Sequence, residues 1–401
     1  MALSKVNILS LSIAISLILK LILLYILGFQ DFPDSITYKR IAREIYELNF
    51  LFPHWENSDA PGAPYFFSFF VPLSEIIGDK AFAIGNVIIS SISILIFYKI
   101  SFLIFNDLRI ANMTAIISAF YPFFNFYSIS GLNETLYIFL LYLSFIFFIK
   151  FYKKLETKDF ILFSIFFAIT TLIKFVNLAM IPFIVVFTIF FMRRKDCSLK
   201  KITSIIFLGV FSYGLIMSPW WLRNYDIHNE VVLTNIGQIG KVFYAGNNAL
   251  NKTGGGINGI DISLEDLDRF RDQNLSDGAM INEALNWIKN NPTDWIILEF
   301  KKIIRFYSPF FHSERYNTFF YNTLSVLTYG TILLFSIISI FRNSNLALSF
   351  GIMLLYSILL TGIHLVFIVS MRYRLPIEPF MIIMASEPLT RIFNRYKSKD
   401  S

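Results

Sequence analysis

Cysteine is almost absent from this sequence, since Cys197 is the only one among 401 residues. One thiol cannot form a disulfide framework or a cysteine-based zinc site. Histidine is nearly as rare, and its residues lie far apart without the spacing of metal ligands: His54, His228, His312 and His364. We therefore predict neither a disulfide scaffold nor a zinc enzyme, and no cofactor. A divalent metal has no support beyond scattered carboxylates.

Charged residues are also scarce, at 16% of the chain, whereas hydrophobic residues make up 55% and phenylalanine alone contributes 46. Several apolar runs reach or approach the length of about 20 residues that crosses a bilayer. These runs predict an all-α polytopic membrane protein, and the phenylalanine excess is interpreted as lipid-facing bulk. The net charge of +7 is interpreted as cytoplasmic loop charge, so we expect no nucleic-acid partner.

The apolar runs predict one integral-membrane domain, residues 1–401, with about ten transmembrane helices. The predicted spans are 6–27, 81–105, 110–129, 135–152, 159–174, 177–192, 200–221, 317–341, 346–369 and 375–392. The first run has no small-residue cleavage site, which favours a helix over a signal peptide. Lys20 falls inside it, and we expect its side chain to snorkel or to face other helices.

The positions of lysine and arginine predict the topology. Basic residues concentrate at 150–158, 193–201, Arg342 and 391–399, and these lie on one side only if 62–78 does not cross. That short stretch contains two prolines and a glutamate, which favours a juxtamembrane or re-entrant segment. We therefore predict a multi-pass protein of the plasma (inner) membrane, with both termini in the cytoplasm.

Three segments are then predicted outside. Residues 28–80 form an external loop that contains an interfacial helix, because Ile36, Ile41, Ile45 and Leu48 recur at helical spacing. A short loop follows at 128–134. Residues 222–316 form an external helical segment, with a turn at 254–256. Its predicted helices start at Ser263, where Asp266 takes the capping-box position, and near Pro292.

Carboxylates and cations gather on this predicted outer face. The acids are Asp31, Asp34 and Glu134, and the bases are Lys174, Arg223, Arg372 and Arg374. This combination suits transfer of a sugar from a lipid phosphate to an acceptor hydroxyl. A carboxylate can act as general base, and cations can stabilise the departing phosphate. The leaving phosphate is a weak base, so no general acid is needed, unlike in glycoside hydrolysis.

Structural roles explain the same residues equally well at this point. A lysine or arginine at an outer helix end often anchors the helix at the interface. Asp31 or Asp34 suits the N-cap of the interfacial helix, and Glu134 suits the start of its own helix. Arg223 suits a tie between the external segment and the membrane helices.

Four stretches in order resemble the polyprenyl-phosphate-dependent GT-C membrane glycosyltransferases, and in particular the protein O-mannosyltransferases and the lipid A aminoarabinose transferase. They are Asp34-Ser-Ile-Thr-Tyr38, Ala60-Pro-Gly-Ala-Pro-Tyr65, Ser218-Pro-Trp-Trp-Leu-Arg-Asn-Tyr225 with Gly246-Asn247-Asn248, and Arg372-Tyr-Arg-Leu-Pro376 with Pro379. The chain departs from the family pattern at the acidic pair, which is Asp34-Ser35 here.

The resemblance implies a GT-C-like bundle and an inverting transferase whose active site lies outside the cytoplasm. It implies an isoprenoid-phosphate sugar as donor, and Asp34 as base with Asp31 as substitute. From the cations of the predicted outer face, we expect phosphate contacts from Arg372, Lys174, Arg223 and Arg374. The resemblance further implies substrate contacts from Tyr38, Glu134, Asn224 and Asn247. The acceptor is left open between a protein, a lipid and a glycan. A transporter or flippase, and a membrane polysaccharide polymerase, are the alternatives.

Overall fold

The computed structural model describes residues 7–48, 60–234, 239–257, 263, 265, 276–313 and 316–397. In these residues the chain is helical, and the one strand-like feature is a single bridge between Gln30 and Ser130. His54 and the predicted capping residue Asp266 lie outside the described residues. The chain divides into two compact units, which are described separately.

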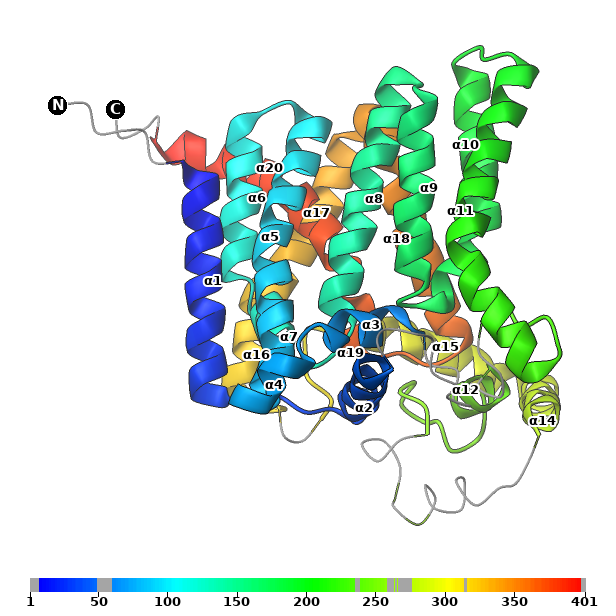
Figure 1. Ribbon diagram of the computed structural model, residues 1–401. Helices are drawn as coiled ribbons and strands as arrows, with labels where there is room; N and C mark the ends of the chain where they lie inside the picture. The colour runs from blue at the N-terminus through cyan, green and yellow to red at the C-terminus, as the bar shows by residue number, and fades with distance from the viewer. Residues whose placement is uncertain are drawn as a thin grey trace. The chain divides into compact units, whose positions relative to one another are not determined.

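The first unit comprises Met1–Leu233, Ile332–Leu354 and Glu378–Ser401. Its helices are α1 (Ile8–Leu27), α2 (Pro33–Glu47), α3 (Gly62–Ser68), α4 (Val71–Ile77), α5 (Lys80–Phe105), α6 (Leu108–Phe120), α7 (Pro122–Ser128), α8 (Glu134–Lys154), α9 (Thr157–Thr171), η1 (Phe175–Met180), α10 (Ile181–Arg194), α11 (Leu199–His228), most of α17 (Thr331–Arg342), η3 (Ser344–Leu346), the start of α18 (Ala347–Val366) and α20 (Glu378–Lys397). In Figure 1, α1, α5, α6, α8 and α9 run alongside one another as the body of this unit.

The second unit comprises Thr234–Thr331 and Leu355–Ile377. Its helices are α12 (Ile239–Gly246), α14 (Asp277–Asn290), α15 (Pro292–Tyr307), α16 (Phe319–Ser325), the π-helical turn η2 (Val326–Gly330), the second half of α18 and α19 (Met371–Arg374). Within it α12 packs on α14, and α15 packs on α19. The predicted single domain and the predicted external segments stay predictions.

Seven helical stretches in the described part of the chain are long and apolar enough to cross a membrane. They are Ile8–Leu27, Lys80–Phe105, Glu134–Lys154, Phe175–Arg194, Leu199–His228, Phe319–Arg342 and Leu348–Val366. The three other predicted spans coincide with less regular segments. Residues 110–129 are divided between α6 and α7 by Pro122, α9 has 15 residues, and α20 contains several charged residues. The expected number of ten spans stays a prediction.

The stretch 62–78 forms two helices, α3 and α4, of seven residues each. At 1.5 Å per residue each is about 10 Å long, which is far shorter than the hydrocarbon core of a bilayer. Pro72 stands at the start of α4 and separates the two helices. This geometry agrees with the interpretation of the stretch as one that does not cross.

A polar stripe runs along the buried side of α1. Ser12, Ser16 and Lys20 follow one another at intervals of four residues, which places them on one helix face. Lys20 is fully buried, and its ammonium donates a hydrogen bond to Ser16. Because α1 packs against α5 and α6, the expectation that Lys20 faces other helices holds.

Phenylalanine side chains fill much of the space between α8, α9 and α10. The ring centroids of Phe148 and Phe163, and those of Phe151 and Phe160, are 5.0 Å apart. Edge-to-face and tilted pairs at this separation stabilise a core beyond the area that they bury. The interpretation of the phenylalanines as lipid-facing bulk is therefore only partly right, since many of them form helix–helix contacts.

Candidate active site

Asp34 lies in the first turn of α2, directly after the chain leaves α1. Phe32 occupies the N-cap position, and its backbone N–H donates to Oγ of Ser35 at 2.8 Å. The interpretation of Asp34 as the N-cap is therefore wrong, and Asp34 instead places a carboxylate beside the positive end of the helix. Its side chain is partly exposed.

Asp31 is bound by a buried lysine. The Lys39 ammonium lies 2.9 Å from Oδ1 of Asp31 and also pairs with Asp79, which Arg43 contacts at 3.1 Å. The Lys39 side chain is only 7% exposed, whereas that of Asp31 is 49% exposed. This network connects α2 to the start of α5, which gives Asp31 a structural role.

A series of polar contacts connects α2 to the start of α8 and the end of α9. Asn133 donates an amide hydrogen bond to the Tyr38 hydroxyl at 2.9 Å. The neighbouring Glu134 forms an ion pair with Lys174 at 2.8 Å, and its side chain is only 1% exposed. The structure therefore brings together three predicted site residues from segments far apart in the sequence, namely Tyr38, Glu134 and Lys174.

The short helix α3 lies against the same region. The backbone N–H of Gly62 donates to the Leu172 carbonyl at 2.7 Å, two residues before Lys174. Tyr65 packs against the buried side chains of Ile41 and Trp220. Burial raises the pKa of Tyr65 to about 12, although nearby Arg223 opposes the shift. The phenol is therefore protonated at neutral pH and able to donate a hydrogen bond.

Arg223 and Asn224 lie in the C-terminal part of the long helix α11. The Arg223 guanidinium lies 4.8 Å from the Trp220 ring centroid and donates to the Asn224 side chain at 2.9 Å. Asn224 in turn donates to the Val232 carbonyl at 3.0 Å and is almost fully buried. These contacts favour a structural role for Asn224, while its predicted substrate contact stays a prediction.

Arg372 and Arg374 of α19 belong to the second unit and differ in their surroundings. Arg374 is fully buried, donates to the carbonyls of Phe306 and Ser308, and lies 3.4 Å from the Tyr329 ring centroid. Arg372 is partly exposed and lies over the neighbouring Tyr373 ring. Of the two, Arg372 is the one with exposed surface.

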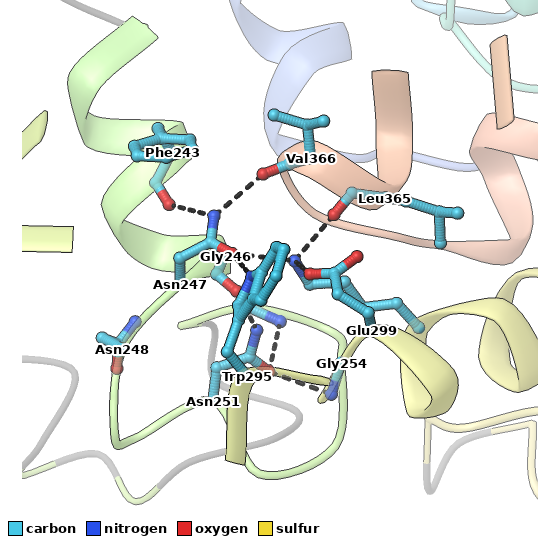
Figure 2. Close-up of polar contacts among 12 residues, drawn as sticks. Phe243, Gly246, Asn247, Asn248, Asn251, Gly254, Trp295, Glu299, Leu365 and Val366 are labelled. Carbon is cyan, nitrogen blue, oxygen red and sulfur yellow. Dashed lines mark hydrogen bonds and ion pairs between the residues drawn. The ribbon is translucent and has the colours of Figure 1, made fainter. Parts of the chain in front are cut away.

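Asn247, also in the second unit, uses its whole amide for internal contacts (Figure 2). Its nitrogen donates to the carbonyls of Phe243 and Val366 at 2.9 and 2.8 Å, and its oxygen accepts from Trp295 and Lys302 at 3.2 Å each. An amide has two donors and two acceptor sites, so no capacity is left for a substrate. The predicted substrate contact of Asn247 stays a prediction that this geometry disfavours.

Sequence reasoning did not single out Lys39, Asp79, Asn133 or Trp295, and it placed Lys302 only among the basic residues of an interfacial helix. Each is polar or aromatic and buried or paired with a residue distant in the chain. No local pattern identifies such partners. Among the residues that the structure describes, no group of three or more His, Cys, Asp or Glu side chains lies together to hold a metal ion.

Comparison with known proteins places this geometry in context. The model of the dolichyl-phosphate-mannose-protein mannosyltransferase family matches residues 58–222. The structure is similar to the oligosaccharyltransferase AglB from Archaeoglobus fulgidus, solved with an inhibitory peptide and dolichol-phosphate. The TM-score is 0.59 at 15% identity, covering 98% of this chain and 51% of AglB. It is also similar to ArnT from Cupriavidus metallidurans bound to undecaprenyl phosphate, with TM-score 0.54 at 13% identity, covering 97% of this chain and 61% of ArnT.

The chain has the GT-C fold. The resemblance predicted from the four motifs is thereby confirmed, both by the family model and by the solved structures. The GT-C chain described here is a multi-pass integral membrane protein and spans about half the length of AglB and three fifths of ArnT. No curated protein matches its sequence.

Proposed function

We propose that the protein is an inverting glycosyltransferase that moves a sugar from a polyprenyl-phosphate carrier to an acceptor hydroxyl at the extracytoplasmic membrane face. The observation that carries the proposal is the contact series from α2 to α8 and α9. It brings Tyr38 of α2 together with Glu134 and Lys174, and the first turn of the same helix carries Asp34. The GT-C fold supports the same reaction class, because AglB and ArnT were solved with polyprenyl phosphates.

In this mechanism the Asp34 carboxylate accepts the proton of the acceptor hydroxyl as its oxygen attacks the anomeric carbon of the donor. The bond between that carbon and the phosphate oxygen breaks, and the carrier phosphate leaves with the bonding electrons. Attack opposite the leaving group inverts the anomeric centre. The departing phosphate needs positive charge but no proton, because a phosphate is a weak base.

Arg372 is the main candidate for the phosphate contact, with Lys174 and Arg223 next. An arginine can contact two phosphate oxygens at once, which a lysine cannot do with the same geometry. Lys174 is already paired with Glu134 at 2.8 Å, so its charge is partly compensated. We leave Arg374 out of the phosphate site, since its guanidinium is fully buried against backbone carbonyls.

The donor is thus a polyprenyl-phosphate-linked sugar and the protein works within a lipid bilayer. The acceptor is a hydroxyl of a protein, a lipid or a glycan, and a polysaccharide polymerase would use the same donor. A flippase would move the lipid without breaking its bond to the sugar.

The experiment supplies the purified protein in detergent with radiolabelled polyprenyl-phosphate sugars and a membrane extract as the source of acceptors. We expect label to leave the lipid fraction, and the Asp34→Asn variant to release far less. If the lipid keeps its sugar with the wild-type protein for every donor tested, the transferase proposal fails. Movement of intact labelled lipid across vesicles would then favour the flippase.

A further inference from the structure

The segment 365–374 runs from the last residues of α18 through α19 and carries Arg372. Buried side chains contact the first residues of this segment. The Lys302 ammonium donates to the Leu365 carbonyl at 2.7 Å, and the Asn247 amide donates to the Val366 carbonyl at 2.8 Å. Lys302 and Asn247 also contact each other at 3.2 Å, so the two contacts form one connected group. Figure 2 shows Asn247 between the carbonyls of Phe243 and Val366.

Backbone packing holds the next two residues. A Cβ atom on Gly246 would lie 1.9 Å from the Phe367 carbonyl oxygen, so only glycine allows this approach. A Cβ on Gly256, whose φ is +89°, would lie 2.7 Å from the Ile368 side chain. The end of α12 at Gly246 and the turn that contains Gly256 therefore fit closely against the segment.

The far end of the segment is held by Arg374. Its guanidinium donates to the carbonyls of Phe306 and Ser308 at the end of α15, the helix that also carries Lys302. Tyr373 stacks on His364 with ring centroids 4.5 Å apart. Arg372 thus belongs to a short stretch of chain whose two ends both contact α15 or the residue that follows it.

Burial of the Lys302 ammonium is energetically unfavourable. Lys302 is fully buried, and burial lowers its pKa, although the ion pair with Glu299 at 2.7 Å opposes that shift. An ammonium has three donors, and here they reach Glu299, Asn247 and Leu365. Burying a charge is tolerated only when its hydrogen bonds are satisfied, which ties Lys302 to this one arrangement of the segment.

We propose that Lys302 and Asn247 are positioning residues for the transfer reaction: they fix the segment 365–374 so that Arg372 is presented to the donor phosphate. This inference rests on the proposed function. It also gives the two predicted ligand contacts, Asn247 and Arg374, a different task, which is to hold Arg372 in place from the two ends of its segment.

The first test measures the segment itself and does not depend on activity. Hydrogen–deuterium exchange of the full-length protein in detergent is compared for Lys302→Met and Lys301→Met. Lys301 is the matched control, because it is exposed on the same helix and donates to a different carbonyl, that of Lys252, at 3.0 Å. We expect exchange over 365–371 to rise about tenfold in Lys302→Met and to stay unchanged in Lys301→Met.

Trp295→Phe provides a second variant in case Lys302→Met does not fold. It removes one N–H donor from Asn247 and keeps an aromatic ring, so a smaller rise confined to the same peptides is expected. Unchanged exchange over 365–371 in every folded variant overturns the proposal.

The second test measures coupling to Arg372. Lys302→Met should lower kcat/KM for the lipid donor about tenfold, whereas Lys302→Met combined with Arg372→Lys should be no slower than Arg372→Lys alone. Lys302→Arg, which retains charge and donors, should recover part of the loss. Losses that multiply in the double variant overturn the link to Arg372. Absence of transfer by the wild type would instead refute the proposed function, with the exchange result unaffected.

Discussion

Asp31 and Asp34 are three residues apart, and their side chains have different surroundings. Asp31 pairs with the buried Lys39, whereas Asp34 stands in the first turn of α2. Substituting each carboxylate in turn therefore separates the proposed base, Asp34, from the neighbouring carboxylate that pairs with Lys39.

We predict that Asp34→Asn inserts, folds and binds donor but transfers sugar at least about a hundredfold more slowly, since removal of a general base typically costs this much. Asp31→Asn should slow transfer less, because it removes no proton acceptor from the proposed reaction and only weakens the contact between Asp31 and Lys39. Rates with a radiolabelled donor, together with donor binding, measure both. Activity that survives in Asp34→Asn and vanishes in Asp31→Asn would move the base three residues upstream.

The Glu134–Lys174 ion pair predicts an asymmetric response to substitution. The Glu134 side chain is 1% exposed and the Lys174 side chain 17%. Water therefore stabilises the charge of Glu134 less, and this charge depends more on the ion pair. Lys174→Met should therefore destabilise the protein by about 3 kcal/mol, the usual cost of leaving a buried charge without its partner. Glu134→Gln should cost less, because water can still reach the lysine.

Unfolding of both variants in detergent measures this difference. The double variant should recover part of the stability lost in Lys174→Met while transfer stays low. Equal losses in the two single variants would show that the burial of Glu134 does not determine the response.

At the scale of elements, the fit of α3 against the end of α9 depends on the absence of a side chain at Gly62. A Cβ there would lie 2.7 Å from the Ile173 side chain and 2.9 Å from the Leu172 carbonyl oxygen. Gly62→Ala should therefore destabilise the protein by about 1–3 kcal/mol, as overpacking usually does.

Gly278→Ala is the matched control, because a Cβ at Gly278 in α14 meets nothing within 4 Å. It should be neutral or stabilising by up to about 1 kcal/mol, given the poor helix propensity of glycine. Thermal unfolding in detergent compares the two. A Gly62→Ala variant as stable as Gly278→Ala would mean that α3 is free to shift away from Leu172.

Elements were also the features that the sequence predicted best. The helical spacing of Ile36, Ile41, Ile45 and Leu48 predicted a helix here, and the structure has one at Pro33–Glu47. Ile41 and Ile45 are fully buried on one face of this helix, α2. Ile36 belongs to the same predicted stripe but is exposed, since periodicity does not reveal how far a neighbouring surface extends. The contact between Tyr38 and Asn133 joins residues 95 positions apart, and a single sequence contains nothing that pairs them.

At the scale of the whole molecule, the distribution of basic residues predicts which loops face the cytoplasm. The loop between α10 and α11 contains Lys195 and Cys197, and the adjoining helix ends carry Arg193, Arg194, Lys200 and Lys201, so this loop should lie inside. Residues 222–316 should lie outside. Lys289 in α14 is exposed, which makes it a suitable reporter position for that segment.

We predict that a Lys289→Cys variant reacts with a membrane-impermeant thiol reagent in intact cells, whereas the wild type, with Cys197 alone, does not. Permeabilised cells provide the control that Cys197 is reactive when reached. Labelling of the wild type in intact cells together with no labelling at position 289 would invert the topology and place the active site in the cytoplasm.

The polar stripe on α1 has a consequence for how the protein is made. Ser12, Ser16 and Lys20 are covered because α1 packs on α5 and α6, yet α1 is synthesised before either of them. An isolated helix with a lysine near its centre pays about 2.5–3.5 kcal/mol on entering lipid. The newly made α1 should therefore stay close to the insertion machinery until α5 and α6 emerge, so that the first helix of the chain is among the last to settle in the bilayer.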